Sequence, residues 1–397
     1  MPRDYRTYAQ ALAGRRLPAA LVDLELFDAN AAALVRRAGG KPLRLATKSV
    51  RCTALLRRVL RAEAGFRGLM AYHPREAAFL AAQGFEDLLV AYPTLDAGAL
   101  AEVARAVAGG ASVTLTVDAP EHVEAAARAA RAAGTALPLC IDVDLSLRLP
   151  GLHFGVHRSP LTTPRAALAL AERVRATPGV RLEGLLGYEA QIAGVPDRSP
   201  GAPLQSAALR LLKRRSLPRL AARRAAVLRA LEEAGFALRF VNAGGTGSLE
   251  SSAAEAGVTE LAAGSGLFAP TLFDGYARFR HQPAALFALP ITRRPAPDLY
   301  TCHGGGYVAS GAGGASRLPT PFLPEGCELV AHEGAGEVQT PVRYTGPEPL
   351  ALGAPLFFRH AKAGELCEHF ATLLLVSGGR VVDEVPTYRG EGQCFLG

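Results

Sequence analysis

The chain has 397 residues, of which 49% are hydrophobic and 20% are charged, and its formal net charge is +8 at pH 7. This length exceeds that of an ordinary domain with one hydrophobic core, so it predicts a large domain and a smaller second domain. No uninterrupted apolar stretch of about 18 residues occurs, which excludes a helical membrane protein. The first residues lack the apolar segment of a signal peptide, so we expect the protein to be cytoplasmic.

The cysteines and the positive charge exclude two further classes. The six cysteines are scattered without a CxxC pair, which argues against a disulfide framework and against a structural zinc cluster. The arginines are dispersed along predicted helices, and their densest cluster is at 211–224 ("LLKRRSLPRLAARR"). That cluster has an amphipathic pattern without interleaved aromatic residues, so it predicts a solvated helix face and no nucleic-acid partner.

Between about residues 17 and 266, short apolar runs alternate with Ala- and Arg-rich segments of helical periodicity. Nine runs predict strands, at 19–24, 43–49, 68–72, 87–92, 112–118, 137–144, 182–190, 239–245 and 260–266. Alternating strands and helices imply a parallel sheet, and about 250 residues of this pattern predict a (β/α)8 TIM barrel. Nine strands are one too many for that barrel.

The pattern changes near residue 275, where the chain becomes rich in glycine and proline. Apolar runs continue at 285–294, 327–333, 353–359, 371–379 and 380–390. Several short strands separated by turn signals predict a C-terminal β-domain.

Lysine is scarce in this chain. Only four of the 44 basic residues are lysine, namely Lys41, Lys48, Lys213 and Lys362. Arginine cannot replace lysine as a neutral nucleophilic amine, because its pKa lies above about 12. Lys48 ends the apolar run "RLATKS", and the working residues of a barrel lie at the C-terminal ends of its strands. We therefore predict that Lys48 is a catalytic amine.

Two glycine-rich runs also follow predicted strands, at 242–248 ("NAGGTGS") and 262–266 ("AAGSG"). They lack the full GxGxxG spacing and come late in the repeat, which disfavours an NAD-binding oxidoreductase. The backbone N–H groups of such turns bind anions, so the runs predict a phosphate site, with a purely structural turn as the alternative. An amine facing a phosphate site predicts pyridoxal 5′-phosphate, whose aldehyde forms a Schiff base with an amine.

The order of these motifs resembles that of a known family. The segments "ALVDLELFDANAAAL", "RLATKS", "GYEAQ", "NAGGTGS", "AAGSGLF" and "AHEGAGEV" are similar to those of fold-type III pyridoxal-phosphate enzymes, and most of all to the D-threonine aldolase and D-serine dehydratase group. The resemblance spans nearly the whole chain. It implies an alanine racemase-like barrel at 25–275 and a β-domain at 276–397, with residues 1–24 joining the β-domain, which accounts for the surplus strand.

Site residues follow from the same resemblance. It implies that Lys48 is the Schiff-base lysine and that Tyr188 is a neighbour of the cofactor. The implied phosphate contacts are Gly245, Thr246, Gly247, Gly264 and Ser265. Arg148 is the candidate partner of the pyridine nitrogen, and Arg158 is the alternative, because the segment at 141–159 departs from the spacing of the family.

The group commonly places a divalent metal on a His-x-Asp or His-x-Cys pair in its C-terminal domain. This chain has His360 but carries Lys362 at the second position, where an ammonium would repel a cation. Cys367 and His369 form another pair, but at i and i+2 of a helical turn their side chains would not share a face. We therefore assign no metal ligand, and the metal requirement stays open.

The resemblance implies a lyase that cleaves the Cα–Cβ bond of a D-β-hydroxy-α-amino acid. His360 is the expected base for the hydroxyl proton, and Lys362 is expected to polarise that hydroxyl. Dehydration with loss of ammonia and racemisation are the alternatives within this cofactor class, and a non-catalytic pyridoxal-phosphate-binding protein is the alternative outside it. Carriers of this fold type are single barrels, so the β-domain argues against a carrier. A homodimer is expected, because family members commonly complete the active site with the C-terminal domain of the partner.

Overall fold

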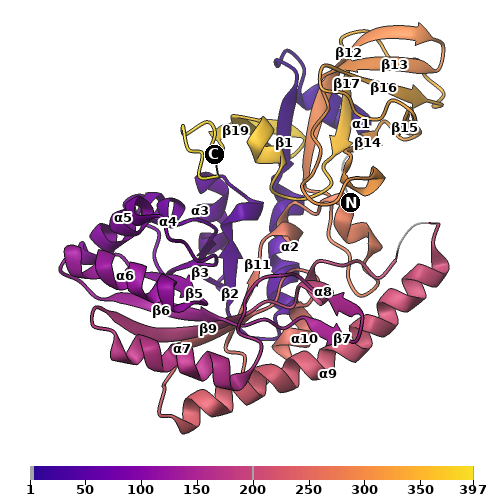
Figure 1. Ribbon diagram of the computed structural model, residues 1–397. Coiled ribbons are helices and arrows are strands. Elements are labelled where there is room, and N and C mark those ends of the chain that lie inside the picture. The colour runs from indigo at the N-terminus through magenta and orange to yellow at the C-terminus, as the bar shows by residue number, and fades with distance from the viewer. Residues whose placement is uncertain (1–3, 199–200, 397) are drawn as a thin grey trace. The chain divides into compact units, whose positions relative to one another are not determined.

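The protein is described by a computed structural model that covers residues 4–198 and 201–396. One part is a closed barrel of eight parallel strands (Figure 1). In chain order these are β2 (Leu43–Ala46), β3 (Phe66–Ala71), β4 (Leu88–Val90), β5 (Val113–Val117), β6 (Leu137–Asp142), β9 (Val180–Gly187), β10 (Phe240–Ala243) and β11 (Glu260–Ala263). The ring closes where β11 pairs with β2, with Ala263 opposite Leu45. The predicted TIM barrel is confirmed.

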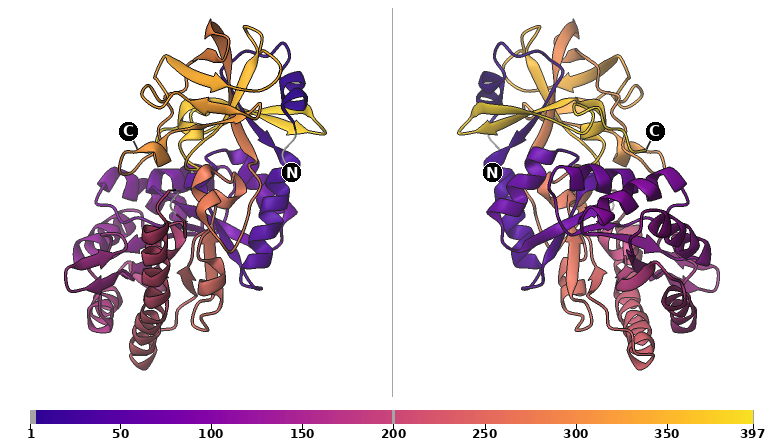
Figure 2. Two further views of the ribbon diagram at one scale, coloured as in Figure 1. Left: turned by 90° about the vertical axis from the view of Figure 1, so that its right-hand side faces the viewer. Right: turned by 90° about the vertical axis from the view of Figure 1, so that its left-hand side faces the viewer.

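Helices connect these strands and cover the outside of the barrel (Figure 1). The main ones are α4 (Pro74–Ala82), α5 (Ala97–Ala108), α6 (Pro120–Ala132), α7 (Pro164–Ala176) and the long α9 (Pro203–Glu233), which lies beside α7 (Figure 2). Local sequence explains where they begin: the Asp96 carboxylate caps α5 by accepting from the Ala99 N–H at 3.1 Å, and the Thr163 hydroxyl caps α7. The arginine-rich segment predicted as a helix lies within α9.

A small hairpin interrupts the alternation of strands and helices. Between β6 and α7 the chain forms two short antiparallel strands, β7 (Leu147–Leu149) and β8 (Leu152–Phe154). This hairpin was not predicted from the sequence. The remaining helices are α1 (Tyr5–Ala11), α2 (Leu24–Arg37), α3 (Thr53–Ala62), α8 (Ala190–Ala193), α10 (Leu249–Ala253) and α11 (Leu366–His369).

A second, nine-stranded sheet forms the β-domain. Its strands are β1 (Ala19–Asp23), β12 (Ala285–Ala296), β13 (Leu299–His303), β14 (Thr320–Leu323), β15 (Cys327–Leu329), β16 (Gln339–Tyr344), β17 (Pro355–Arg359), β18 (Thr372–Ser377) and β19 (Arg380–Pro386). The ninth predicted strand is β1, which pairs antiparallel with β12 and parallel with β18. Buried Tyr8, Leu21 and Phe357 belong to its core. Among the described residues, no helix is both long and apolar enough to cross a bilayer.

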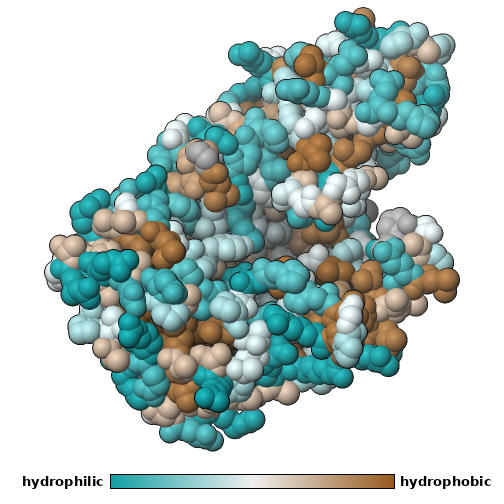
Figure 3. Space-filling model, viewed as in Figure 1, coloured by the Kyte–Doolittle hydropathy of each residue, from teal (hydrophilic) through white to brown (hydrophobic). Residues whose placement is uncertain are grey.

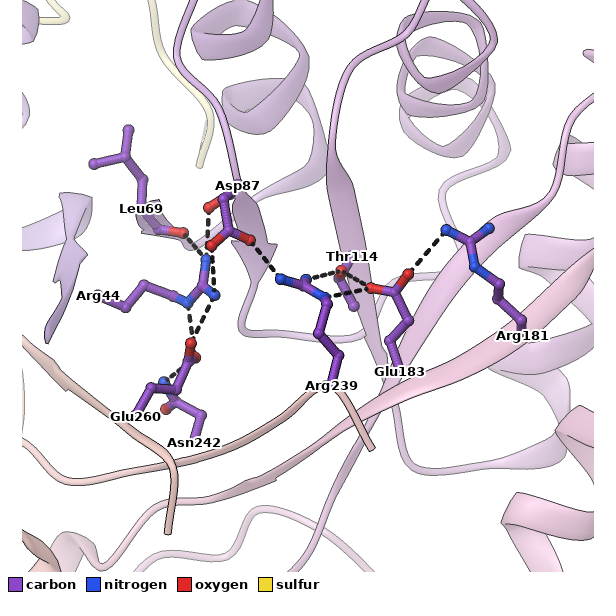
Figure 4. Close-up of polar contacts among 9 residues, drawn as sticks. All are labelled: Arg44, Leu69, Asp87, Thr114, Arg181, Glu183, Arg239, Asn242 and Glu260. Carbon is purple, nitrogen blue, oxygen red and sulfur yellow. Dashed lines mark hydrogen bonds and ion pairs between the residues drawn. The ribbon is translucent and has the colours of Figure 1, made fainter. Parts of the chain in front are cut away.

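A buried arginine lies at the closure of the barrel (Figure 4). The Arg44 side chain on β2 is 1% exposed, and its Nε and Nη2 donate to the two carboxylate oxygens of Glu260 on β11, at 2.8 and 2.9 Å. Arg44 Nη2 also donates to the Asp87 carboxylate, at 3.1 Å. The forked guanidinium therefore ties together the two strands that close the ring and the residue that precedes β4.

The same network extends towards the surface of the barrel (Figure 4). Asp87 accepts a second hydrogen bond from Arg239, at 3.1 Å, and Arg239 also pairs with Glu183 of β9 at 3.0 Å. Arg181 reaches the other oxygen of Glu183 at 2.8 Å, with its own side chain 54% exposed. Charge is thus balanced inside the network, and the most buried member is Arg44.

Replacement of Arg44 tests how much this network stabilises the fold. In Arg44→Met the apolar stem remains, but Glu260 and Asp87 lose their shared cation, so we expect the free energy of unfolding to fall by about 3 kcal/mol. The matched control is Arg181→Met, at the exposed end of the network, which should cost less than about 1 kcal/mol. Urea unfolding of both variants measures the difference; equal losses would contradict the special role of the buried arginine.

Candidate active site

The amine of Lys48 lies at the C-terminal end of the barrel strands. Lys48 follows β2 in a short 3-10 turn, Thr47–Ser49, and its side chain is exposed. The turn is held by the Thr47 hydroxyl, which donates to the Met70 carbonyl at the end of the neighbouring strand at 3.0 Å. Lys48 Nζ lies 3.2 Å from the phenol oxygen of Tyr92. The predicted amine is therefore at the expected end of its strand, hydrogen-bonded to a phenol.

Tyr92 comes two residues after β4 and is 40% exposed. Two cations lie against its ring, with Lys48 Nζ at 5.7 Å and the Arg158 guanidinium at 5.0 Å from the ring centroid. Burial by itself would raise the pKa of the Tyr92 phenol, but the two positive charges and the hydrogen bond from Lys48 outweigh it and lower that pKa. Tyr92 therefore links the amine to the guanidinium.

Arg158 is fixed by groups at the ends of two strands. Its Nη2 donates to the Ala91 carbonyl at 2.8 Å, and its Nε donates to a carboxylate oxygen of Asp142, the last residue of β6. Burial raises the pKa of Asp142 to about 6, although the Arg158 charge acts in the opposite direction. The guanidinium also lies 5.7 Å from the Tyr188 ring centroid. Arg158 is thus held between two tyrosines.

Arg148, the other candidate for the pyridine nitrogen, lies elsewhere. It belongs to β7, its side chain is 53% exposed, and its Nη2 donates to the Asp144 carboxylate at 2.8 Å. The barrel strand that precedes it, β6, already ends at Asp142. The structure therefore brings Arg158 next to the phenol that contacts Lys48, and does not bring Arg148 there.

Tyr188 and the glycine-rich turn lie together. Tyr188 follows β9, and burial raises the pKa of its phenol to about 12, with smaller contributions from nearby acidic groups. A Cβ atom on Gly245 would lie 2.9 Å from the Ala193 Cβ and 3.2 Å from Tyr188 Cε2, so this position has no room for a side chain. Thr246 and Gly247 continue the same turn. The predicted cofactor neighbour thus contacts the predicted phosphate turn.

Buried charges hold this turn in place. The Ser248 hydroxyl accepts from the Gly245 N–H and donates to Glu189, both at 3.1 Å. Glu189 is fully buried and pairs with Arg224, which is 1% exposed, at 3.0 Å. The backbone of the turn is therefore preorganised before any ligand binds.

The last predicted phosphate residues follow β11. Gly264 comes directly after this strand, which is the neighbour of β2 in the ring, so it lies at the same end of the barrel as Lys48. Ser265 opens a 3-10 turn, Ser265–Leu267, and its hydroxyl lies 2.9 Å from that of Ser49, the residue after Lys48.

His360 and Lys362 follow β17 in the β-domain. His360 is buried, and burial lowers the pKa of its imidazole to about 4, so the ring is neutral at pH 7. Its Nδ1 contacts the Lys362 carbonyl oxygen, which requires the proton on Nδ1 and leaves Nε2 as an acceptor. Within residues 4–198 and 201–396 that Nε2 has no hydrogen-bond partner. The Lys362 N–H donates to the Glu365 carboxylate at 2.5 Å.

Cys367 and His369 are not brought together by α11. The Cys367 thiol is buried and donates to the Val50 carbonyl at 3.2 Å, whereas the exposed His369 ring stacks on Tyr307 with centroids 4.5 Å apart. The described part of the chain contains no group of three or more His, Cys, Asp or Glu side chains arranged to hold a metal ion.

Two residues of this site were not predicted from the sequence. Tyr92 and Asp142 lie at the ends of β4 and β6, and both fall inside runs that were predicted as strands, "DLLVAY" and "LPLCIDVD". The rule that selected Lys48 would have selected Tyr92 as well, because it is the last residue of its run.

The fold has known counterparts. Residues 22–271 match the family model of the alanine racemase N-terminal domain. The structure is similar to that of D-threonine aldolase from Filomicrobium marinum, with a TM-score of 0.80 and 19% identity over 96% of each chain. It is also similar to D-threo-3-hydroxyaspartate dehydratase from Delftia sp., with a TM-score of 0.76 and 21% identity over 95% of this chain and 98% of that one.

One curated relative is similar over a shorter stretch. The 3-hydroxy-D-aspartate aldolase of Paracoccus denitrificans is 26% identical over 184 residues, which are 46% of this chain and 42% of the relative. The matched part therefore spans less than half of that relative. The two solved structures, at their low identities, establish the shared fold.

Titration of Tyr92 tests the electrostatics of the site. In Lys48→Met the ammonium and its hydrogen bond are lost, so we expect the pKa of Tyr92 to rise. Ultraviolet difference titration, with each protein compared to its own Tyr92→Phe counterpart, isolates this phenol from the other tyrosines. The control Lys41→Met removes a lysine that contacts the Glu255 carbonyl instead and should leave Tyr92 unchanged. An unchanged pKa in Lys48→Met would rule out the contact.

Proposed function

This chain belongs to the alanine racemase N-terminal domain family, and we propose that it is a pyridoxal 5′-phosphate-dependent lyase acting on a D-β-hydroxy-α-amino acid. The reaction is cleavage of the Cα–Cβ bond. The observation that carries the proposal is the exposed Lys48 amine beside Tyr92 and Arg158 at the C-terminal end of the barrel strands. The names of the relatives, two aldolases and a dehydratase of D-β-hydroxy amino acids, support the substrate class.

The residues present fit this cofactor. Lys48 offers an exposed amine, and Gly245 lies where no side chain has room, which suits close approach of a phosphate to the backbone. When bound, pyridoxal 5′-phosphate supplies an aldehyde that reacts with amines and a ring that accepts electrons from a breaking bond. We propose that the phosphate is held by Gly245, Thr246, Gly247, Gly264 and Ser265.

Arg158 is our proposed partner of the pyridine nitrogen, in preference to Arg148. The support is its contact with Tyr92, its contact with Tyr188 and the Asp142 carboxylate that orients it. A guanidinium keeps its proton at neutral pH, so it leaves the ring nitrogen unprotonated and the ring a weaker electron acceptor. That property suits a lyase, in which the negative charge at Cα is quenched soon after it forms.

His360 is our proposed base for the hydroxyl proton of the substrate. Its neutral imidazole has an acceptor Nε2 with no partner in the described residues, and such an atom suits either a proton or a cation. Lys362, two residues on, is proposed to polarise the hydroxyl in place of a divalent metal. Whether the enzyme requires a metal is decided by the chelator experiment below.

The other expectations remain predictions. Dehydration with loss of ammonia and racemisation use the same cofactor chemistry and are distinguished only by the products. A non-catalytic carrier of the cofactor would bind pyridoxal 5′-phosphate and form no product. The homodimer and the cytoplasmic location are likewise proposed, on the resemblance and on the sequence respectively.

Trapping the cofactor and assaying products tests the proposal. Borohydride reduction of the loaded protein should fix pyridoxal phosphate on Lys48, as located by mass spectrometry, and Lys48→Ala should abolish both trapping and turnover. A panel of D- and L-β-hydroxy amino acids should yield an aldehyde and glycine from the D-isomers. Ammonia would instead indicate the dehydratase, inversion of the substrate the racemase, and the absence of any product a carrier. Cofactor fixed on another lysine would refute the assignment of Lys48.

Lys362 gives a separate test of metal dependence. If its ammonium acts in place of a divalent ion, turnover should survive exhaustive chelation, and Lys362→Ala should lose most activity. Lys362→Asp offers a carboxylate beside His360, so its activity should be low and should rise when manganese is added. The control Lys362→Arg keeps the positive charge and should remain insensitive to chelator. Loss of wild-type activity with chelator, or full turnover in Lys362→Ala, would show that the lysine does not replace a metal.

A further inference from the structure

A small cavity with a basic lining lies between the β7–β8 hairpin and α9, and none of its lining residues is proposed above to hold the cofactor or the substrate. Its volume is about 200 Å³, and apart from leucines it is lined by Ser146, Arg148, Ser216, Arg219 and Arg223. Among the residues that the structure describes, no acidic side chain lines it. Figure 3 shows hydrophilic residues mixed with hydrophobic ones over the part of the surface that α9 covers, and Leu204 and Leu211 of this helix are exposed. Three arginines around one cavity raise the question of what they bind.

Two of the three guanidiniums are held in place by the protein. Arg148 donates to the Asp144 carboxylate at 2.8 Å. Arg223 Nη1 donates to the backbone carbonyls of Asp144 and Ser146, both at 3.0 Å. Each guanidinium has five N–H donors, so these contacts leave several donors on each for a ligand. Side chains that are already oriented lose little entropy when they bind one.

Arg219 completes the set from the same helix face. It precedes Arg223 by four residues on α9, the spacing that places two side chains next to each other. Its side chain is exposed, and within residues 4–198 and 201–396 it forms no ion pair or side-chain hydrogen bond. In the described part of the chain, the Asp144 carboxylate is the one acidic group that pairs with these arginines, so positive charge exceeds negative charge around the cavity.

Ser216 adds a buried donor. It is 1% exposed, and its hydroxyl oxygen accepts a hydrogen bond from the Gln191 side-chain amide at 2.8 Å. A hydroxyl that accepts in this way keeps its own hydrogen available to donate. No acceptor for that hydrogen is present among the described residues. A buried hydroxyl with an unused donor and three guanidiniums is a donor set suited to an oxyanion.

We propose that this cavity binds a phosphate group, as inorganic phosphate or as a phosphate monoester. Tetrahedral oxyanions match several converging N–H and O–H donors, and arginine binds them with two parallel hydrogen bonds. The cavity is small and has no aromatic lining on which bases would stack, so it does not suit nucleic acid. This site is separate from the glycine-rich turn, and it stands whether or not the proposed function does.

Calorimetric titration at constant ionic strength in chloride tests this site. The protein is first loaded with pyridoxal 5′-phosphate and reduced with borohydride, so that the glycine-rich turn is already occupied. Inorganic phosphate and glycerol 3-phosphate are the two probes, and binding of either supports the site while their relative affinities identify the source. We expect one site per chain, with affinity weakened about tenfold in Arg219→Ala because one charged donor is lost.

Arg215→Ala is the matched control, because Arg215 is exposed on the same helix but does not line the cavity. It should bind both probes as the parent does. Ser216→Ala should weaken binding while its far-ultraviolet circular dichroism stays unchanged. Equal losses in Arg215→Ala and Arg219→Ala would show non-specific charge attraction and overturn the proposal, as would a parent protein that binds neither probe at millimolar concentration. A protein that cannot be loaded with the cofactor is titrated as purified, and only the site sensitive to Arg219→Ala counts.

Discussion

Closure of the barrel depends on a buried ion pair between Arg44 and Glu260. Arg44 carries its guanidinium into the ring at the junction of β2 and β11, where the Glu260 carboxylate accepts from two of its three nitrogens. Stripping water from an arginine costs several kcal/mol unless it is fully paired, so the two strands fit together only in the register that supplies this pairing. Lys48 lies four residues beyond Arg44 on the same segment. The position of the amine therefore follows from the way the ring closes.

The position of Lys48 also affects the pKa of its neighbour Tyr92 at the C-terminal end of the barrel strands. Lys48 and Arg158 bring two positive charges against one phenol, and these charges lower the pKa of Tyr92. The pKa of Asp142 shifts in the other direction, because burial of the carboxyl group raises it. A chain that uses arginine for nearly all of its positive charge thus carries an exposed lysine, Lys48, at the position proposed for the reactive amine. The other positive charge at Tyr92 is the guanidinium of Arg158, which keeps its proton at neutral pH, and not a second amine.

Much of the fold could be read from the sequence, because periodicity reports burial. Every barrel strand begins within a predicted apolar run or close to one. The ninth predicted strand, one more than the barrel needs, is β1 of the β-domain. Side-chain partners were harder to foresee. Arg148 and Arg158 lie ten residues apart in one segment, and only the β7–β8 hairpin, which carries no strong pattern, decides which of them reaches Tyr92. The Arg44 network was equally invisible, because pairing across a ring depends on register and not on local pattern.

The position of β1 has a consequence for synthesis. This strand lies between β12 and β18, and more than 250 residues separate Asp23 from Ala285, where β12 begins. On the ribosome β1 emerges first, yet its two partners are made only after the whole barrel has been translated. Its apolar edge must wait unpaired throughout that time, which is the condition under which strands associate with the wrong chain. The order of translation thus keeps this short strand without its sheet partners until β12 and β18 have both been made.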